Sequence, residues 1–451
     1  MTESKEIEMH ENLSSNMFRL YKQKVVSAEK AVQSIKSHDK ILVHSNCAFP
    51  STTINALVKR SNELNGVSIY HALAVGELPY LSKGMEKHFT HYSFFLGNNS
   101  RKAVQEGRAE FIPIFLAEVP LLFISGAIKL DAAIIHVSPP DEHGFCSYGV
   151  EVGLTKAGAE RASIIIAQVN NKMPRTLGDS FIHVSKIDYI VEVDEEINEL
   201  TGSDINVNDE EKKIYDLIGK NVASLIEDES TLQLGIGAIP NSILPFLADK
   251  KDLGVHSELF SDGVIDLIEK GIITNEKKTL HPGKVIAGFV LGTKKIYDFI
   301  DNNPIFEFHS QEYVNDPFII AKNDKMVAIN SAIEVDITGQ VCADSIGDRL
   351  YSGFGGQLDF IRGASRSKGG KPIIAIPSCT KNQNISRIVT KLKSGAGVVT
   401  TKGDVHFIVT EYGTAQLYGK TIRERVKALI DIAHPKFREE LLKSAHENSY
   451  I

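Results

Sequence analysis

Cysteine and long apolar runs are both scarce in this sequence. The four cysteines, Cys47, Cys146, Cys342 and Cys379, are scattered and include no CxxC pair. They indicate neither a disulfide framework nor a zinc knuckle, so we expect buried, reduced thiols. The longest apolar stretches, such as residues 285–292, fall far short of the roughly 18 residues that a membrane span needs. Because the N-terminus is also polar and mixed in charge, we expect a cytoplasmic protein with no membrane partner.

An excess of positive charge is missing as well. Acidic residues outnumber basic residues by 57 to 50, which gives a formal net charge of −7. A chain with this balance has no global basic field to gather nucleic acid, so we expect no nucleic-acid partner. Any anionic ligand must find a local basic pocket.

The sequence does contain the material for two α/β domains. Its 451 residues exceed one ordinary domain, and 42% hydrophobic residues are enough for more than one core. Continuous apolar runs predict strands that are covered on both faces. These runs span residues 40–44, 67–71, 111–116, 132–137, 163–169, 285–290, 372–376 and 407–410. Helix-period segments between them predict an α/β fold with open, largely parallel sheets.

A polar stretch in the middle of the chain predicts the domain boundary. Residues 201–212 (TGSDINVNDEEK) are poor in apolar side chains and precede the clearest amphipathic segment, residues 211–227. In that segment one buried helical face is predicted by the spacing of Ile214, Leu217, Ile218, Val222, Leu225 and Ile226. We therefore predict an N-terminal domain of residues 1–205 and a C-terminal domain of residues 206–451.

A glycine-rich turn, residues 233–241 (QLGIGAIPN), follows a predicted strand and meets Pro240 at a predicted helix start. Glycines let backbone amides approach a ligand, and a helix N-terminus favours an anion or a developing oxyanion. A nicotinamide site is disfavoured, because Pro240 stands where the third glycine of GxGxxG belongs. A purely structural turn remains an alternative interpretation.

A second segment, residues 256–263 (HSELFSDG), places Glu258 between a short strand and a helical pattern. Sheets of α/β proteins usually keep reactive groups at such connections, although position alone also permits a structural carboxylate. The spacing His256-x-Glu258 is also found in zinc deaminases, but the PCxxC that they need is absent. Residues 141–143 (DEH) are better interpreted as a tight polar turn than as a metal cluster. We predict no metal site.

The third segment, residues 351–360 (YSGFGGQLDF), can present several backbone N–H groups to one ligand atom. A basic run follows it directly. Its cations Arg362, Arg366 and Lys368 are candidates for binding phosphates in an otherwise acidic protein. Solvated surface charge is the alternative explanation for them.

Together these segments resemble the family of acetyl-CoA hydrolases and transferases that includes 4-hydroxybutyrate CoA-transferase, within the class I CoA-transferases. The resemblance extends over nearly the whole chain. It includes residues 99–120, 137–152, 173–188, 235–240 (GIGAIP), 256–271, 328–341, 353–364 (GFGGQLDFIRGA) and 408–425. It implies two α/β domains of related CoA-transferase fold, coenzyme A or acyl-CoA as substrate, no permanently bound cofactor, and a homodimer or higher homo-oligomer.

The resemblance also implies roles for individual residues. The family's catalytic glutamate falls on Glu258, and Asn315 matches a supporting position. The elements that hold the thioester and coenzyme A fall on Gly235, Ile236, Gly237, Ala238, Ile239, Gly355, Gly356 and Gln357. The expected reaction moves CoA from an acyl-CoA, such as acetyl-CoA, to a short carboxylate such as 4-hydroxybutyrate or butyrate. A hydrolase that uses the same glutamate is the alternative, and a non-catalytic CoA-binding module is a further one.

Overall fold

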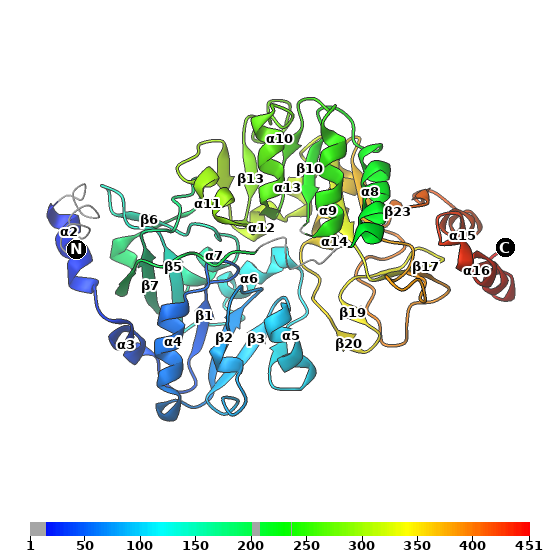
Figure 1. Cartoon of the computed structure of the whole chain (residues 1–451). Coiled ribbons are helices and arrows are strands. Elements are labelled where there is room, and N and C mark those ends of the chain that lie inside the picture. The colour runs from blue at the N-terminus through cyan, green and yellow to red at the C-terminus, as the bar shows by residue number, and fades with distance from the viewer. Residues whose placement is uncertain (1–14, 201–207, 236) are drawn as a thin grey trace. The chain divides into compact units, whose positions relative to one another are not determined.

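The computed structural model describes residues 15–200, 208–235 and 237–451 (Figure 1). The chain forms two compact units, each with its own central sheet. Unit 1 comprises Met1–Thr201 and Ala287–Tyr313, and unit 2 comprises Gly202–Ile286 and Val314–Ile451. The boundary predicted after residue 205 lies outside the described residues. Residues 287–313, which a division by chain order counts with the second half, pack with the first unit.

Unit 1 is built on a seven-stranded parallel sheet in the order β4-β3-β2-β1-β5-β7-β9. Its strands are β1 (Lys40–Val43), β2 (Val67–His71), β3 (Phe89–Ser93), β4 (Glu110–Phe111), β5 (Ala132–Val137), β7 (Ile164–Asn170) and β9 (Tyr189–Val193). Every residue of β5 is buried, as a strand covered on both faces requires. One prediction was wrong here: residues 111–116 do not form a strand. Pro113, which has no N–H to donate to a sheet, follows β4 closely, and the chain turns into a 3₁₀ helix at Leu116–Glu118.

Helices surround this sheet and complete the core of unit 1. They are α2 (Ser15–Lys24), α3 (Ala28–Ala31), α4 (Ser51–Lys59), α5 (Asn98–Gln105), α6 (Val119–Ile124), α7 (Thr155–Ala159) and α11 (Lys294–Ile300). Residues Ile54 and Leu57 of α4 pack with Ile41 and Val43 of β1 in one buried cluster. A short antiparallel pair joins β6 (Phe145–Ser147) to β8 (Phe181–His183).

Unit 2 contains a six-stranded sheet in the order β11-β10-β16-β21-β23-β24. Its strands are β10 (Thr231–Leu234), β11 (Gly254–Val255), β16 (Met326–Ser331), β21 (Lys371–Ala375), β23 (Phe407–Thr410) and β24 (Gly413–Gln416). All neighbouring pairs are parallel except β23 and β24. The predicted α/β class with open, largely parallel sheets is therefore confirmed.

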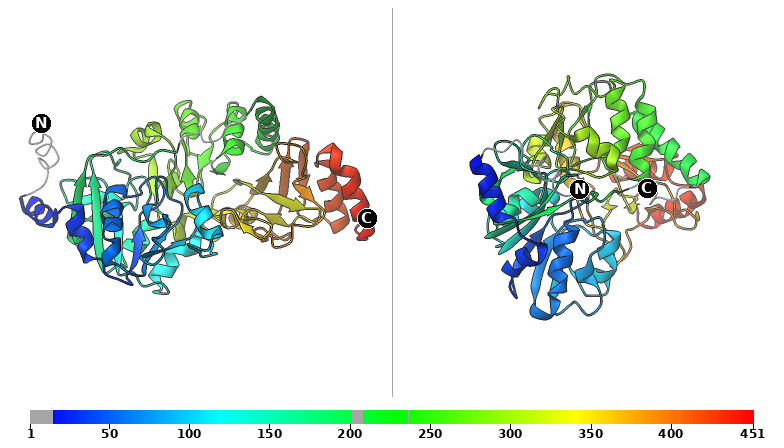
Figure 2. Two further views of the ribbon diagram at one scale, coloured as in Figure 1. Left: turned by 60° about the horizontal axis from the view of Figure 1, so that its bottom comes forward. Right: turned by 60° about the vertical axis from the view of Figure 1, so that its left-hand side comes forward.

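The helices of unit 2 are α8 (Asp209–Ala223), α9 (Ala238–Ile243), α10 (Ile265–Glu269), α13 (Pro317–Ile320), α14 (Gln357–Arg366), α15 (Ile422–Asp431) and α16 (Pro435–Glu447). Helices α15 and α16, drawn in red, lie side by side in both views of Figure 2. Shorter strands of unit 2 are β12 (Leu259–Phe260), β17 (Glu334–Asp336), β18 (Val341–Cys342), β19 (Ser345–Ile346), β20 (Arg349–Leu350) and β22 (Ile388–Val389). Strand β13 (Val285–Ala287) ends at the unit boundary, and β14 (Phe289–Val290) and β15 (Phe306–Phe308) belong to the part of unit 1 formed by residues 287–313. The predicted strand over residues 285–290 is thus two strands, β13 and β14, separated by Gly288.

Helix α8 shows how a sequence pattern was only partly right. A capping box starts it, since the Asn208 side chain accepts from Glu211 N–H and the Glu211 side chain accepts from Asn208 N–H. The helix ends at Ala223, and Leu217 is 50% exposed although the spacing predicted it to be buried. The buried face is shifted toward Gly219, where an added Cβ would lie 2.3 Å from the Ser242 carbonyl oxygen. Close approach to the segment at α9 therefore decides which face of α8 is covered.

Two further observations bear on the sequence predictions. All four cysteines are buried and unbonded, as predicted. None of the helices in the described ranges is both long and apolar enough to cross a membrane.

Candidate active site

Glu258 lies at the carboxyl edge of the unit 2 sheet. Strand β11 pairs in parallel with β10, with Leu232 opposite Val255, and His256 N–H still donates to the Leu232 carbonyl at 3.1 Å. Gly235 directly follows β10, and Glu258 lies in the short connection between β11 and the strand β12 rather than directly before a helix as predicted. Because the carboxyl ends of neighbouring parallel strands meet at one edge, the HSELFSDG segment and the glycine turn after β10 share the edge where α/β proteins bind ligands.

Two hydrogen-bond donors hold the Glu258 carboxylate. The buried amide of Asn315 donates from Nδ2 to Glu258 Oε2 at 3.0 Å, and the Gly356 backbone N–H donates to the same carboxylate. Burial raises the pKa of Glu258 above its ordinary value, and these two hydrogen bonds oppose that rise. Asn315 and Gly356 were both predicted site residues, and the structure brings them together with Glu258.

The close packing around residue 356 leaves room only for glycine. An added Cβ would lie 1.8 Å from Glu258 Oε2 and 2.2 Å from Asn315 Nδ2, so no side chain fits there. Its φ of −95° is accessible to any residue, in contrast to Gly355, whose φ is +55°. Gly356 is also the N-cap residue of α14, and the partial positive charge of this helix end lies beside the carboxylate.

Residues of α14 fix this turn to the rest of unit 2. The buried Gln357 donates from Nε2 to the carbonyl of Ser331, at the end of β16, at 3.2 Å. The buried Asp359 places Oδ2 at 3.4 Å from Asn315 Nδ2. Sequence reasoning did not single out Asp359, and its only signal was its place in the GFGGQLDF segment.

His256 has a structural role. Its Nε2 lies 2.8 Å from the Val314 carbonyl, and its Nδ1 lies 3.4 Å from Asn323 Nδ2. These contacts anchor the chain immediately before Asn315. Because both ring nitrogens face protein partners, His256 and Glu258 do not form the zinc-type arrangement that their spacing suggested.

The glycine turn after β10 depends on backbone conformation. Gly237 has a φ of +117°, which favours glycine, while its added Cβ would meet nothing within 4 Å. Helix α9 begins at Ala238, and Ile239 is buried. Ile236, another predicted site residue, lies outside the described residues. Gly235 directly follows Leu234 of β10, and its added Cβ would make an ordinary contact of 3.7 Å with Pro240.

The predicted phosphate-binding cations lie along α14 and beyond its end. Arg362 pairs with Asp404 at 3.3 Å, and the exposed Lys368 lies 3.6 Å from Asp324. Arg366 is the last residue of the ten-residue helix, about 15 Å along the axis from the end beside Glu258. The structure therefore does not bring Arg366 or Lys368 to the candidate nucleophile.

A cavity of about 510 Å³ lies next to the GFGG turn within unit 2. Ser352, one of its lining residues, directly precedes Gly353, and Ser331, another, accepts the hydrogen bond from Gln357. The remaining lining residues are Ala332, Ile333, Glu334, Ala343, Ile346, Tyr351, Thr380, Ile385, Ser386, Arg387 and Lys393. Within the described part of the chain, the buried Nε of Arg387 has no hydrogen-bond partner. Sequence reasoning missed Arg387, which no local motif marks.

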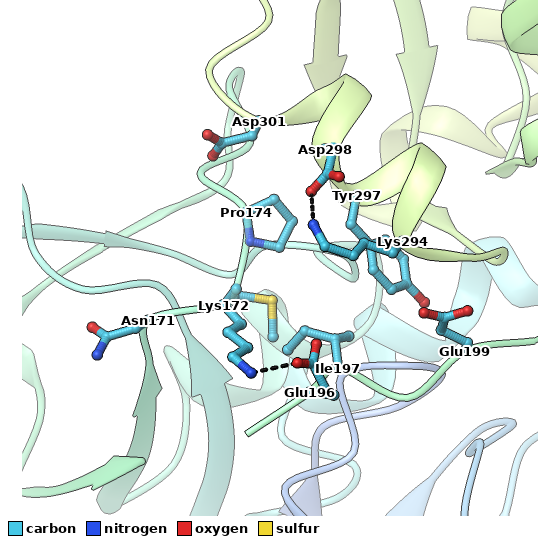
Figure 3. A pocket seen from close by; sticks show the side chains of 11 residues that line it. Asn171, Lys172, Pro174, Glu196, Ile197, Glu199, Lys294, Tyr297, Asp298 and Asp301 are labelled. Carbon is cyan, nitrogen blue, oxygen red and sulfur yellow. Dashed lines mark hydrogen bonds and ion pairs between the residues drawn. The ribbon is translucent and has the colours of Figure 1, made fainter. Parts of the chain in front are cut away.

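A second cavity, of about 560 Å³, lies in unit 1 (Figure 3). Its charged lining comprises Lys172, Glu196, Glu199, Lys294, Asp298 and Asp301. Both lysines are already paired, Lys172 with Glu196 and Lys294 with Asp298, as the dashed lines in Figure 3 mark. With carboxylates in excess, this cavity offers no surplus positive charge to a phosphorylated ligand.

Comparisons with known proteins identify the family. Residues 9–200 match the acetyl-CoA hydrolase/transferase N-terminal domain, and residues 292–445 match the acetyl-CoA hydrolase/transferase C-terminal domain. A 4-hydroxybutyrate coenzyme A transferase from Clostridium kluyveri is 53% identical over 94% of this chain and 97% of its own length. A succinyl-CoA:acetate/propanoyl-CoA:succinate CoA transferase from Fasciola hepatica is 49% identical over 92% of this chain and 86% of its own. A solved 4-hydroxybutyrate CoA-transferase from Porphyromonas gingivalis gives a TM-score of 0.82 at 41% identity, over 95% of this chain and 99% of that chain.

Proposed function

The chain belongs to the acetyl-CoA hydrolase/transferase family and is a CoA-transferase, and we propose that Glu258 is the residue that carries CoA between two carboxylic acids. The observation that supports this proposal is the pair of donors, Asn315 Nδ2 and the Gly356 N–H, that face one carboxylate at a sheet edge. We propose acetate and either 4-hydroxybutyrate or butyrate as the exchanged acids, in line with the relatives' names.

The first half of the proposed reaction consumes acyl-CoA. The Glu258 carboxylate attacks the thioester carbonyl, the carbon–sulfur bond breaks, and an acyl-glutamyl anhydride and CoA thiolate form. The thiolate then attacks the Glu258 carbonyl and releases the first acid as its carboxylate, which leaves a glutamyl-CoA thioester. A second carboxylate reverses both steps and leaves as the new acyl-CoA. Atoms and charge balance without any metal or redox step.

The contacts at Glu258 supply what these steps need. Each tetrahedral intermediate develops an oxyanion, and a preorganised donor is worth about 3–4 kcal/mol when aimed at it. Asn315 Nδ2 and the Gly356 N–H, which face the Glu258 carboxylate, are the proposed donors to the intermediate that forms on the Glu258 carbonyl. The backbone from Gly235 to Ile239 is the proposed third source of donors. The rise in the pKa of Glu258 caused by burial makes its carboxylate a better nucleophile, while both hydrogen bonds favour its ionised form.

The cavity beside the GFGG turn is the proposed binding site for the part of CoA that does not react. Its volume of about 510 Å³ is that of a small-molecule site, and its lining combines apolar residues with Arg387 and with Lys393, which pairs with Glu334 at 3.9 Å. Contacts made there with parts of CoA that do not react can supply binding energy for the unstable intermediates. The contribution of Arg362, Arg366 and Lys368 to phosphate binding stays a prediction, as do a homo-oligomeric state, a cytoplasmic location and the absence of a permanent cofactor.

Covalent labelling tests the role of Glu258. The purified protein is incubated with acetyl-CoA without an acceptor acid and then treated with borohydride, which reduces a thioester to an alcohol. We expect loss of activity and a modified peptide that contains Glu258, with protection when acetate is added before the reductant. The isosteric variant Glu258→Gln should take no label.

The results separate the alternatives. Retained activity after this treatment, or a label on a peptide without residue 258, contradicts the assignment of the nucleophile. A label without protection by acetate keeps the nucleophile but favours a hydrolase, in which water resolves the thioester. Full activity of Glu258→Gln with no label would show that a different residue or a different mechanism carries CoA, whereas a wild-type protein with neither activity nor label would favour the class of CoA-binding modules.

A further inference from the structure

Asp359 shares an amide with the candidate nucleophile. It lies in the first turn of α14, is only 5% exposed, and accepts from Asn315 Nδ2 at 3.4 Å. The same nitrogen donates to Glu258 Oε2 at 3.0 Å. One amide group therefore connects two carboxylates that come from different elements of unit 2.

The other end of this amide is not held. Within the described residues, Asn315 Oδ1 is buried and has no hydrogen-bond partner. An asparagine amide can be turned over about its last torsion angle, which exchanges its donor and its acceptor. In the turned-over state Oδ1 would face the carboxylates of Glu258 and Asp359 and be repelled. The orientation that presents N–H to residue 258 thus depends on these two carboxylates.

The proposed reaction removes one of them. In the anhydride and in the glutamyl-CoA thioester, Glu258 no longer carries a negative charge and becomes a much weaker acceptor. Asp359 is not modified in any step. It is also flanked by Phe360, which packs in a buried cluster with Val314, the residue before Asn315. The positions of both partners are therefore fixed by the core.

Resting on the function proposed above, we propose that Asp359 is a positioning residue, which keeps the Asn315 N–H turned toward the carbonyl of residue 258 while Glu258 is covalently modified. The amide then meets the oxyanion that develops on the acyl-enzyme. Without Asp359, no carboxylate holds the Asn315 amide while Glu258 is covalently modified. The amide can then turn over, and its N–H no longer faces the carbonyl of residue 258 in the steps that form the oxyanion.

Two variants of the full-length protein test the role. Asp359→Leu has similar shape and no acceptor, whereas Asp359→Asn keeps an amide oxygen that can accept from Asn315. We expect Asp359→Leu to lower kcat by roughly 10-fold to 100-fold, the cost of a misplaced catalytic group, with KM for acetyl-CoA changed by less than about 2-fold. Asp359→Asn should lie between it and the wild type. Circular dichroism and thermal melting establish that each variant is folded.

A double-mutant cycle with Asn315→Ala asks whether Asp359 acts through the amide. In the Asn315→Ala background, Asp359→Leu should change kcat by less than about 2-fold, because the group that it positions is already absent. The position of the acidic limb in the pH dependence of kcat/KM provides an independent test. In the free enzyme the ionised Glu258 accepts from Asn315 by itself, so Asp359→Leu should keep this hydrogen bond and should not move the acidic limb to higher pH. Removal of a neighbouring negative charge alone would move it to lower pH.

The outcomes distinguish this inference from the function on which it rests. Multiplicative losses in the cycle overturn positioning through Asn315, and an upward shift of the acidic limb overturns a role confined to the covalent intermediates, because it would show that the amide is already misplaced in the free enzyme. An inactive Glu258→Gln together with a fully active Asp359→Leu keeps the nucleophile and removes the role of Asp359. An active Glu258→Gln removes both. If Asp359→Leu does not fold, an Asp359→Asn protein with wild-type kcat and pH profile is the result that overturns the inference.

Discussion

Substitution of Gly356 by alanine should lower catalytic activity far more than it lowers stability. The added Cβ would lie 1.8 Å from Glu258 Oε2, whereas ordinary contacts begin near 3.4 Å. The carboxylate must therefore withdraw by about 1.6 Å, since the φ of −95° at this residue does not itself resist alanine. A displacement of about 1 Å can cost about 100-fold in rate, so we expect Gly356→Ala to lower kcat by at least about 100-fold. Crowding of this kind costs about 1–3 kcal/mol of stability.

Gly363 provides a matched control on the same helix. Its added Cβ would lie 2.4 Å from Ile320 Cγ2, a comparable clash that lies two turns along α14 and in the core. Gly363→Ala should therefore lose stability to a similar extent while it keeps most of its turnover. The assays are initial rates of acetyl-CoA formation from butyryl-CoA and acetate, with thermal melting of both variants. The reasoning is refuted if Gly356→Ala turns over within about 3-fold of the wild type, or if Gly363→Ala loses activity equally.

Two further predictions concern the cavity and the buried histidines. Arg387→Gln should raise KM for acyl-CoA by at least about 10-fold, because a charge-assisted hydrogen bond contributes about 1.5–3 kcal/mol, and the rise should be smaller at high salt. Lys427→Gln on α15 is the control, and a rise in KM for Arg366→Gln instead would place the phosphates at the far end of α14. Burial lowers the pKa of His71 to about 4 and that of His136 to about 3. Below about pH 6.5 these histidines bind protons in the unfolded chain but stay neutral in the folded chain. The free energy of unfolding should therefore fall as the pH is lowered toward 4. His71→Gln should recover about 2 kcal/mol of the loss in unfolding free energy between pH 7 and pH 5, and an unchanged pH dependence in this variant would show that His71 is not the group responsible.

The sequence by itself determined the elements and the local turns. Apolar runs covered on both faces located β2, β5 and β23, because such a pattern depends only on neighbouring residues. The same local chemistry predicted the glycine turns and a connection at the end of β11 for Glu258, although a short strand, β12, separates Glu258 from the helix that was predicted to follow it. It erred where a longer-range contact intervened, as at Leu217, whose exposure depends on how closely Gly219 approaches Ser242.

Only the tertiary structure decided which side chains meet. Glu258 and Asn315 are 57 residues apart, and Asn315 and Asp359 are 44 apart, and no periodicity relates residues at such distances. They meet because β11 and the start of α14 bring separate segments to one edge of a parallel sheet. The run of cations after the GFGG turn illustrates the same limit. Its members are adjacent in sequence, yet a helix that rises about 1.5 Å per residue carries Arg366 away from the carboxylate, while Arg387, far along the chain, lines the cavity beside the turn.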